Sequence, residues 1–348
     1  MNALPAFAST GVGTVPFLEV PETLDRIARD CPDLPYWPQM IRMHPGADMI
    51  LQFAEILPFL IVDTGQRKII VESEHREEAL AEFYERIMAG DLDYFALPHD
   101  SANSFYAFLD RAKADPDFGP VYLKGQVTGP ITFGQAIRTA EGKSLIDDPE
   151  IADPIVKGLG AIAAWQVREI NATGRSPLIF IDEPSLTGFG SAFSTLNREE
   201  VIRMLNETIE TAHSSGPVLT GIHVCGNTDW GMVLSSNLDV INFDAFGYLD
   251  AFLLYTEDII RFIERGGYLA WGIVPTLDYS EDISAAELAS RLKTAILGLA
   301  GQGIDLELLK NRSLITPACG LGPLSEYVAK RVSGLTARIS EIMREEGP

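Results

Sequence analysis

Short apolar runs alternate with amphipathic helical segments along most of this chain, and that alternation limits its possible folds more than any other feature. Apolar strands are expected within residues 9–17 and at 121–128, 178–181, 217–225, 240–244, 268–274 and 313–319. Helical periodicity separates them, most clearly at 148–171, 197–212, 256–265 and 285–299. Strands alternating with helices of this length predict right-handed βαβ units and a parallel sheet.

The number of predicted strands, about eight, favours a closed (β/α)₈ barrel over an open sheet. A chain of 348 residues could hold one large α/β domain or two small ones. No linker, internal repeat or low-complexity segment divides residues 1–348, so one catalytic domain is expected. The segments 59–62 and 68–71, joined by a Thr64-Gly65-Gln66 turn, predict a small hairpin that decorates the N-terminal part of the barrel.

Polar residues follow the predicted strands at their carboxyl ends. They are Asp182, Glu183, His223, Cys225, Asp244, Thr276 and Cys319. In a (β/α)₈ barrel these ends surround one mouth, which is where the active sites of this fold lie. An open sheet would instead spread the same residues along an edge, so their distribution also favours the barrel.

The strand that ends in His223-Val224-Cys225 carries the most specific chemical signal in the sequence. Side chains two positions apart in a strand point to the same face, so the imidazole and the thiol should converge. These donors select zinc or copper(I) over magnesium or calcium. A lone His-x-Cys pair also occurs by chance, and a buried cysteine usually behaves as a small hydrophobe. Asp244 and Cys319 lie at equivalent strand ends and are candidate further ligands.

Composition excludes several classes of partner and location. The formal net charge is −22 and the 27 basic residues form no block, which argues against binding to nucleic acid or to anionic membranes. No apolar run reaches the length of a membrane span, and the N-terminus lacks the basic start of a signal peptide. A soluble cytoplasmic protein is expected, in which its three cysteines remain reduced. Cys31 is interpreted as structural.

Taken together, these motifs resemble the cobalamin-independent methionine synthase family, specifically its C-terminal catalytic barrel. The wider group includes uroporphyrinogen decarboxylase and zinc methyltransferases that act on methylated corrinoids. The matching segments occur in the family's order over nearly the whole chain, and they are STGVGTVP at 9–16, KGQVTGP at 124–130, IDEP at 181–184, HVC at 223–225, DVINFD at 239–244, GIV at 272–274 and PACGL at 317–321.

The resemblance implies a zinc site and a substrate site. The zinc ligands would be His223, Cys225, Asp244 and Cys319, although the family's methionine synthases usually have Glu at the position of Asp244. Asp182, or its neighbour Glu183, would bind the substrate ammonium group. Thr14 and its turn would lie near the substrate carboxylate.

The function implied is zinc-dependent methyl transfer to a thiol, most directly to homocysteine in methionine biosynthesis. A thiol with a pKa near 8.5 is only a few per cent ionised at pH 7, and coordination to zinc deprotonates it. The full-length enzymes carry a second barrel that helps to bind the folate donor, and the chain resembles the short core form without it. Either a methylated corrinoid protein or methyltetrahydrofolate is therefore a candidate donor.

Two alternatives remain at the level of sequence. A metal-free decarboxylase of the uroporphyrinogen type would leave His223, Cys225 and Cys319 without a common purpose. Its polycarboxylate substrate would also require arginines at the mouth, where Arg42 is the candidate in the early loops. A non-catalytic zinc- or corrinoid-binding protein would have a closed site that exchanges no ligand when homocysteine is added.

Overall fold

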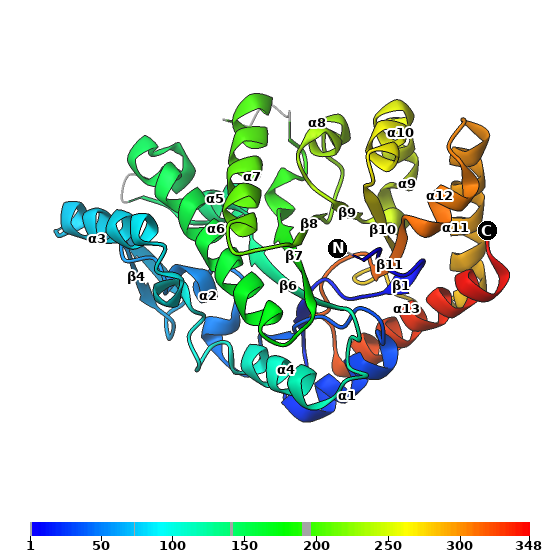
Figure 1. Cartoon of the computed structure of the whole chain (residues 1–348), viewed down its shortest axis with the longest axis horizontal. Helices are drawn as coiled ribbons and strands as arrows, with labels where there is room; N and C mark the ends of the chain where they lie inside the picture. The colour runs from blue at the N-terminus through cyan, green and yellow to red at the C-terminus, as the bar shows by residue number, and fades with distance from the viewer. Residues whose placement is uncertain (1, 73, 140–141, 190–195) are drawn as a thin grey trace.

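A curled parallel sheet of seven strands forms the centre of the computed structural model (Figure 1). The structure describes residues 2–72, 74–139, 142–189 and 196–348. In spatial order the strands are β1 (Ala8–Ser9), β11 (Ser313–Pro317), β10 (Tyr268–Val274), β9 (Val240–Phe243), β8 (Leu219–Val224), β7 (Ser176–Asp182) and β6 (Tyr122–Thr128). Each neighbouring pair is parallel, which confirms the predicted βαβ organisation.

The sheet differs from the expected eight-stranded barrel between its edge strands, β1 and β6. An extended segment, residues 35–40, lies at this position. On one side it exchanges backbone hydrogen bonds with Lys124 of β6, from Lys124 N to Pro35 O (2.9 Å) and from Trp37 N to Lys124 O (2.8 Å). On the other side its end, β3 (Gln39–Met40), pairs with β2 (Thr14–Val15). Pro35 and Pro38 lack the N–H groups that a regular strand needs, so the segment forms short links on each side and no continuous strand.

Helices surround the sheet on its outer side (Figure 1). Their bounds are α1 (Val20–Asp30), α2 (Leu51–Ala54), α3 (Arg76–Ala89), α4 (Asn103–Ala114), α5 (Pro130–Ala136), α6 (Pro149–Asn171), α7 (Arg198–His213), α8 (Trp230–Ser235), α9 (Ala245–Leu253), α10 (Thr256–Glu264), α11 (Ala285–Gly301), α12 (Leu306–Asn311) and α13 (Glu326–Glu346). The helices expected at 148–171, 197–212, 256–265 and 285–299 are present as α6, α7, α10 and α11, whereas α9 and α12 were not predicted.

The two faces of the sheet have different neighbours. Alternate strand residues such as Ile179, Ile222 and Ile241 belong to the large core that the helices cover. The intervening residues, among them Phe180 and Val240, form a second and smaller apolar cluster on the inner face. Because side chains alternate along a strand, the polar residues two positions further on continue this inner face toward the carboxyl ends. The apolar cluster is thus the floor beneath the predicted site.

The predicted hairpin is present as β4 (Leu60–Asp63) and β5 (Lys68–Val71). The two strands are antiparallel, and their register pairs Leu60 with Val71 and Asp63 with Lys68. Leu60 packs into the large core, whereas Ile61 and Ile70 lie on the exposed face. The hairpin therefore attaches to the main fold through one face only.

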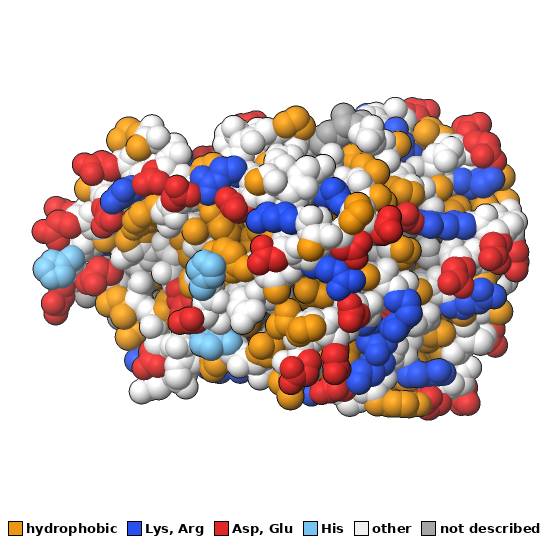
Figure 2. Space-filling view, turned by 60° about the horizontal axis from the view of Figure 1, so that its bottom comes forward, with side chains coloured by type: hydrophobic (Ala, Val, Ile, Leu, Met, Phe, Trp, Pro, Cys, Tyr) orange, Lys and Arg blue, Asp and Glu red, His pale blue; other side chains and the backbone are white. Residues whose placement is uncertain are grey.

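The surface carries acidic and basic side chains side by side, as Figure 2 shows for one face of the molecule. Many of them form ion pairs, such as Arg111 with Asp25 at 2.7 Å and Arg344 with Asp33 at 2.6 Å. Such exposed pairs each contribute little to stability. Within the described ranges, none of the helices has both the length and the apolarity that crossing a membrane requires.

Candidate metal centre

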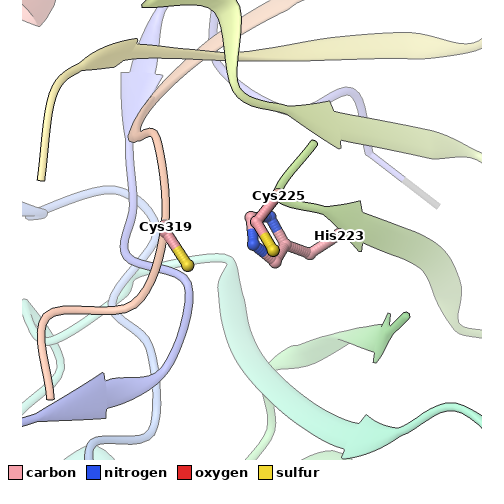
Figure 3. A group of neighbouring side chains, drawn as sticks. All are labelled: His223, Cys225 and Cys319. Carbon is pink, nitrogen blue, oxygen red and sulfur yellow. The ribbon is translucent and has the colours of Figure 1, made fainter. Parts of the chain in front are cut away.

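Three of the predicted ligands converge at the carboxyl ends of β8 and β11. One donor atom each from His223, Cys225 and Cys319 lies within 4.8 Å of the other two. His223 is in β8, Cys225 follows the last residue of that strand, and Cys319 lies two residues beyond β11. In Figure 3 the Cys319 sulfur points toward the other two side chains from the neighbouring loop. The structure thus brings together side chains that the sequence placed at separate strand ends.

Asn242 of β9 fixes the orientation and the tautomer of His223. The amide Nδ2 of Asn242 donates to Ala270 O (2.8 Å) and to Thr316 Oγ1 (2.7 Å). The amide oxygen therefore faces Nδ1 of His223 at 2.6 Å and must accept its hydrogen. Nε2 consequently carries a lone pair, and it is buried without any hydrogen-bond partner. A second polar side chain that orients a histidine in this way is typical of metal ligands.

The donors fit a zinc ion. A buried imidazole nitrogen without a partner beside two thiols is a soft donor set of the kind that zinc prefers. A hydrogen bond from Cys319, together with His223, lowers the pKa of Cys225 to about 4, although burial opposes this shift. The same hydrogen bond and burial raise the pKa of Cys319. Cys225 is thus the more acidic of the two thiols and the one that ionises first.

Burial lowers the pKa of His223, but the neighbouring Cys225 and the charge of Asp182 raise it more, so that the net shift is upward. An imidazole between a thiolate and a carboxylate lies in a negative environment. Such an environment also favours a bound cation.

Asp244 does not join these three side chains in the structure. It precedes α9, and its Oδ1 accepts a hydrogen bond from Gly247 N at 2.7 Å, so it caps that helix. Burial raises the pKa of Asp244, while the hydrogen bonds from Gly247 and Phe246 and the charge of His223 lower it. The carboxylate is thus near enough to interact electrostatically with His223, but it lies outside the compact donor group.

A cavity of about 270 Å³ opens beside the three donors. Two predicted substrate-binding residues line it, namely Asp182 at the end of β7 and Thr14 at the start of β2. Asp182 is only 7% exposed, and its Oδ1 is buried without a partner. Burial raises its pKa to about 6, with the charges of Lys124 and His223 acting in the opposite direction. Asp182 therefore presents an unsatisfied acceptor in this cavity.

Glu183, the alternative to Asp182, is engaged elsewhere. Its Oε1 accepts from Ile131 N (3.0 Å), and its Oε2 accepts from the backbone N (2.7 Å) and the hydroxyl (2.6 Å) of Thr132. These donors belong to the first turn of α5, so Glu183 satisfies the amides at the start of that helix. Burial raises its pKa to about 7, and these hydrogen bonds oppose the shift. It is not among the residues that line the cavity.

Two buried polar residues near the site were not singled out from the sequence. Asn242 orients His223, as described above. Lys124 of β6 is fully buried, and its Nζ donates to Val12 O at 2.7 Å and lies 4.4 Å from the centre of the Phe180 ring. Burial lowers the pKa of Lys124 to about 8, while the charge of Asp182 raises it. Each residue is a polar position within an otherwise apolar strand. Because buried polar groups need partners, this pattern could have identified both residues from the sequence.

Replacing Asn242 with leucine is expected to weaken zinc binding by about 10- to 100-fold, because the hydrogen bond that holds His223 is lost. Competition with a chromophoric zinc chelator measures the change. Asn237→Leu makes the same substitution at an exposed asparagine and should leave zinc affinity unchanged. Equal zinc affinities of Asn242→Leu and the wild-type protein would show that Asn242 does not orient a metal ligand.

No family model and no curated protein sequence matches the chain. Among solved structures, a putative vitamin B12-independent methionine synthase from Listeria monocytogenes aligns with a TM-score of 0.54 at 12% identity, over 98% of this chain and 99% of that one. A B12-independent methionine synthase from Shewanella sp. W3-18-1 in complex with selenomethionine aligns over 69% of this chain and 67% of its own, with a TM-score of 0.47 at 22% identity. The chain therefore has a fold similar to that of the Listeria protein along nearly its whole length.

Proposed function

We propose that this protein is a zinc-dependent S-methyltransferase whose acceptor is a small thiol, with homocysteine converted to methionine. The observation that carries the proposal is the convergence of one ring nitrogen of His223 and two thiols within 4.8 Å beside a cavity. The methyl donor would be either a methylated corrinoid protein or methyltetrahydrofolate. Residues 1–348 would act as one catalytic domain, in a reducing compartment such as the cytoplasm that keeps the three free cysteines reduced.

His223, Cys225 and Cys319 would hold the zinc ion. When bound, zinc would supply the positive charge that keeps a substrate thiol deprotonated near neutral pH. The protein prepares its donors for this role, because Asn242 keeps His223 Nε2 free and Cys319 stabilises the thiolate of Cys225. Asp244 would serve as the fourth ligand if its carboxylate exchanged its contact with Gly247 for the metal.

Asp182 would bind the ammonium group of the acceptor. Its buried Oδ1 has no partner, and an ammonium group provides both the hydrogen bond and the charge that such an oxygen lacks. Thr14 would contribute a neutral hydroxyl to the same cavity. These groups would fix the direction from which the sulfur meets the methyl group, and orientation of this kind supplies much of the acceleration in a two-substrate reaction.

The cavity favours this function over decarboxylation of a polycarboxylate tetrapyrrole. The described residues that line it include two carboxylates, Asp48 and Asp182, and neither lysine nor arginine. A substrate with many carboxylates would meet repulsion there. A decarboxylase without a metal would also have no use for the convergence of His223 with two thiols.

Incubation of the zinc-loaded protein with L-homocysteine and a methyl donor tests the proposal. Methylcobalamin and methyltetrahydrofolate are offered separately, and methionine is measured by mass spectrometry. Methionine is expected with at least one donor and should disappear when a chelator removes the metal. A protein that holds zinc but forms no methionine with either donor would be a closed, non-catalytic zinc protein instead.

A further inference from the structure

Arg67, whose side chain is 60% exposed, lies outside the lining of the cavity but forms an ion pair with a residue that lines it. Its Nη2 lies 3.0 Å from Oδ2 of Asp48, and Asp48 is one of the lining residues. Arg67 immediately precedes β5, in the connection between β4 and β5. The hairpin, which otherwise decorates the fold, therefore contacts the wall of the proposed substrate site.

The backbone of Arg67 is in a conformation that this residue type rarely adopts. Its φ is 52°, in the left-handed region, and among the described residues only Phe7 shares a positive φ without being glycine. Glycine would take this conformation without a steric penalty. A non-glycine residue held in a strained conformation next to a site suggests a role for its side chain.

The contact with Asp48 leaves most of the guanidinium available. Oδ1 of Asp48 accepts from Ile50 N at 2.9 Å, so the carboxylate is itself fixed at the start of α2 while Oδ2 holds Arg67. A guanidinium has five N–H donors in a planar fork, and the contact with Asp48 uses one of them. The remaining donors suit a second carboxylate, which arginine binds in a bidentate manner.

Among the described residues that line the cavity, Asp182 can receive an ammonium group, but no lysine or arginine is there to receive a carboxylate. Asp182 offers the unpartnered acceptor, and Thr14 offers only a neutral hydroxyl. A zwitterionic thiol also brings a carboxylate, and an ionised carboxylate in a partly buried site needs a counter-charge. Arg67, which is ion-paired with the lining residue Asp48, can supply this counter-charge.

We propose that Arg67 binds the carboxylate of the acceptor thiol and thereby makes the site selective for amino-acid thiols over simple aminothiols. The inference rests on the proposed function and adds the residue that determines its specificity. Asp48 holds the guanidinium at the cavity edge, Arg67 pairs with the carboxylate and Asp182 pairs with the ammonium group. The β4–β5 hairpin is then part of the substrate site.

Two ligands test this proposal with the zinc-loaded protein. L-Homocysteine carries thiol, ammonium and carboxylate groups, whereas 3-aminopropane-1-thiol has the same thiol and amine without the carboxylate. Their dissociation constants are measured by calorimetry under reducing conditions. Arg67→Gln should weaken the binding of homocysteine about tenfold, which is the effect of losing one favourable ion pair. It should leave the binding of 3-aminopropane-1-thiol unchanged. Lys68→Gln removes an adjacent positive charge from the same hairpin and should change neither constant.

The variant Arg67→Gly tests whether a loss of binding comes from the missing side chain or from a misfolded hairpin. It should weaken the binding of homocysteine as much as Arg67→Gln does. Its Tm should equal or exceed that of the wild type, because glycine relieves the strained φ. Equal effects of Arg67→Gln on both ligands, or no effect on either, would overturn the role of Arg67 while leaving the proposed function intact. A zinc-loaded wild type that binds neither thiol would overturn the proposed function and this inference with it.

Discussion

Cys225→Ser is expected to reduce methyl transfer to homocysteine by about 10³-fold, since ionisation of the acceptor thiol and its orientation would both be lost. The substitution keeps the size of the side chain but removes the sulfur whose pKa lies at about 4 in this structure. A serine hydroxyl remains protonated there and is a poor ligand for a soft metal. The initial rate of methionine formation at saturating homocysteine measures the effect.

Cys31→Ser provides the matched control for this substitution. Cys31 is the third cysteine, buried in the large apolar core and not among the residues that line the cavity. The same change of sulfur to oxygen at that position should leave the activity of the folded protein near the wild-type value. Full zinc content together with full activity in Cys225→Ser would contradict the proposed site.

Asp182→Asn is expected to raise KM for homocysteine by about 10- to 100-fold, the cost of losing a partly desolvated charge pair with the substrate ammonium group. Asparagine has the same shape but no negative charge. Zinc content should stay at the wild-type level, because Asp182 is not one of the three converging donors. The effect on KM should exceed the effect on kcat, since the ammonium group is remote from the reacting sulfur.

A ligand without the ammonium group distinguishes this role from a structural one. 4-Mercaptobutanoate has the thiol and carboxylate of homocysteine but no amine, so its affinity should not fall in Asp182→Asn. Because the charge of Asp182 also raises the pKa of the buried Lys124, thermal unfolding is measured alongside. Equal losses of affinity for both ligands would indicate that Asp182 maintains the shape of the cavity and does not bind the amine.

The convergence of His223, Cys225 and Cys319 could be predicted because it follows from topology. In a parallel sheet the carboxyl ends of the strands lie at one edge, so polar residues that end successive apolar runs are brought together. The HVC and PACGL motifs marked those ends in the sequence. What remained beyond prediction was which neighbouring polar groups share the site.

Asp244 shows why the fourth ligand stays a prediction. An aspartate between a strand and a helix can serve as a metal ligand or as a helix cap, and both roles use the same carboxylate. Here its Oδ1 accepts from Gly247 N, three residues further on, in the usual geometry of a cap. The helix α9 was not predicted, and so the competing role was not recognised.

The other misses depend on contacts between distant parts of the chain. The count of about eight strands placed none at residues 35–40, where the structure has an extended segment with short backbone links, and prolines at 35 and 38 prevent a regular strand there. The pairing of Arg67 with Asp48 joins a hairpin turn to the start of α2, and no local pattern predicts it. Periodicity therefore located the mouth of the fold, whereas its polar detail depends on tertiary packing.

Zinc content, measured by mass spectrometry on the wild-type protein and on Cys319→Ser prepared identically, tests the central claim most directly. About one zinc per chain in the wild type and a clear loss in the variant are expected, because Cys319 and Cys225 would bind one ion from the ends of two different strands. A wild-type protein that contains no zinc and takes up none when it is supplied would contradict the claim. The thiolate chemistry proposed for this cavity would then have no basis.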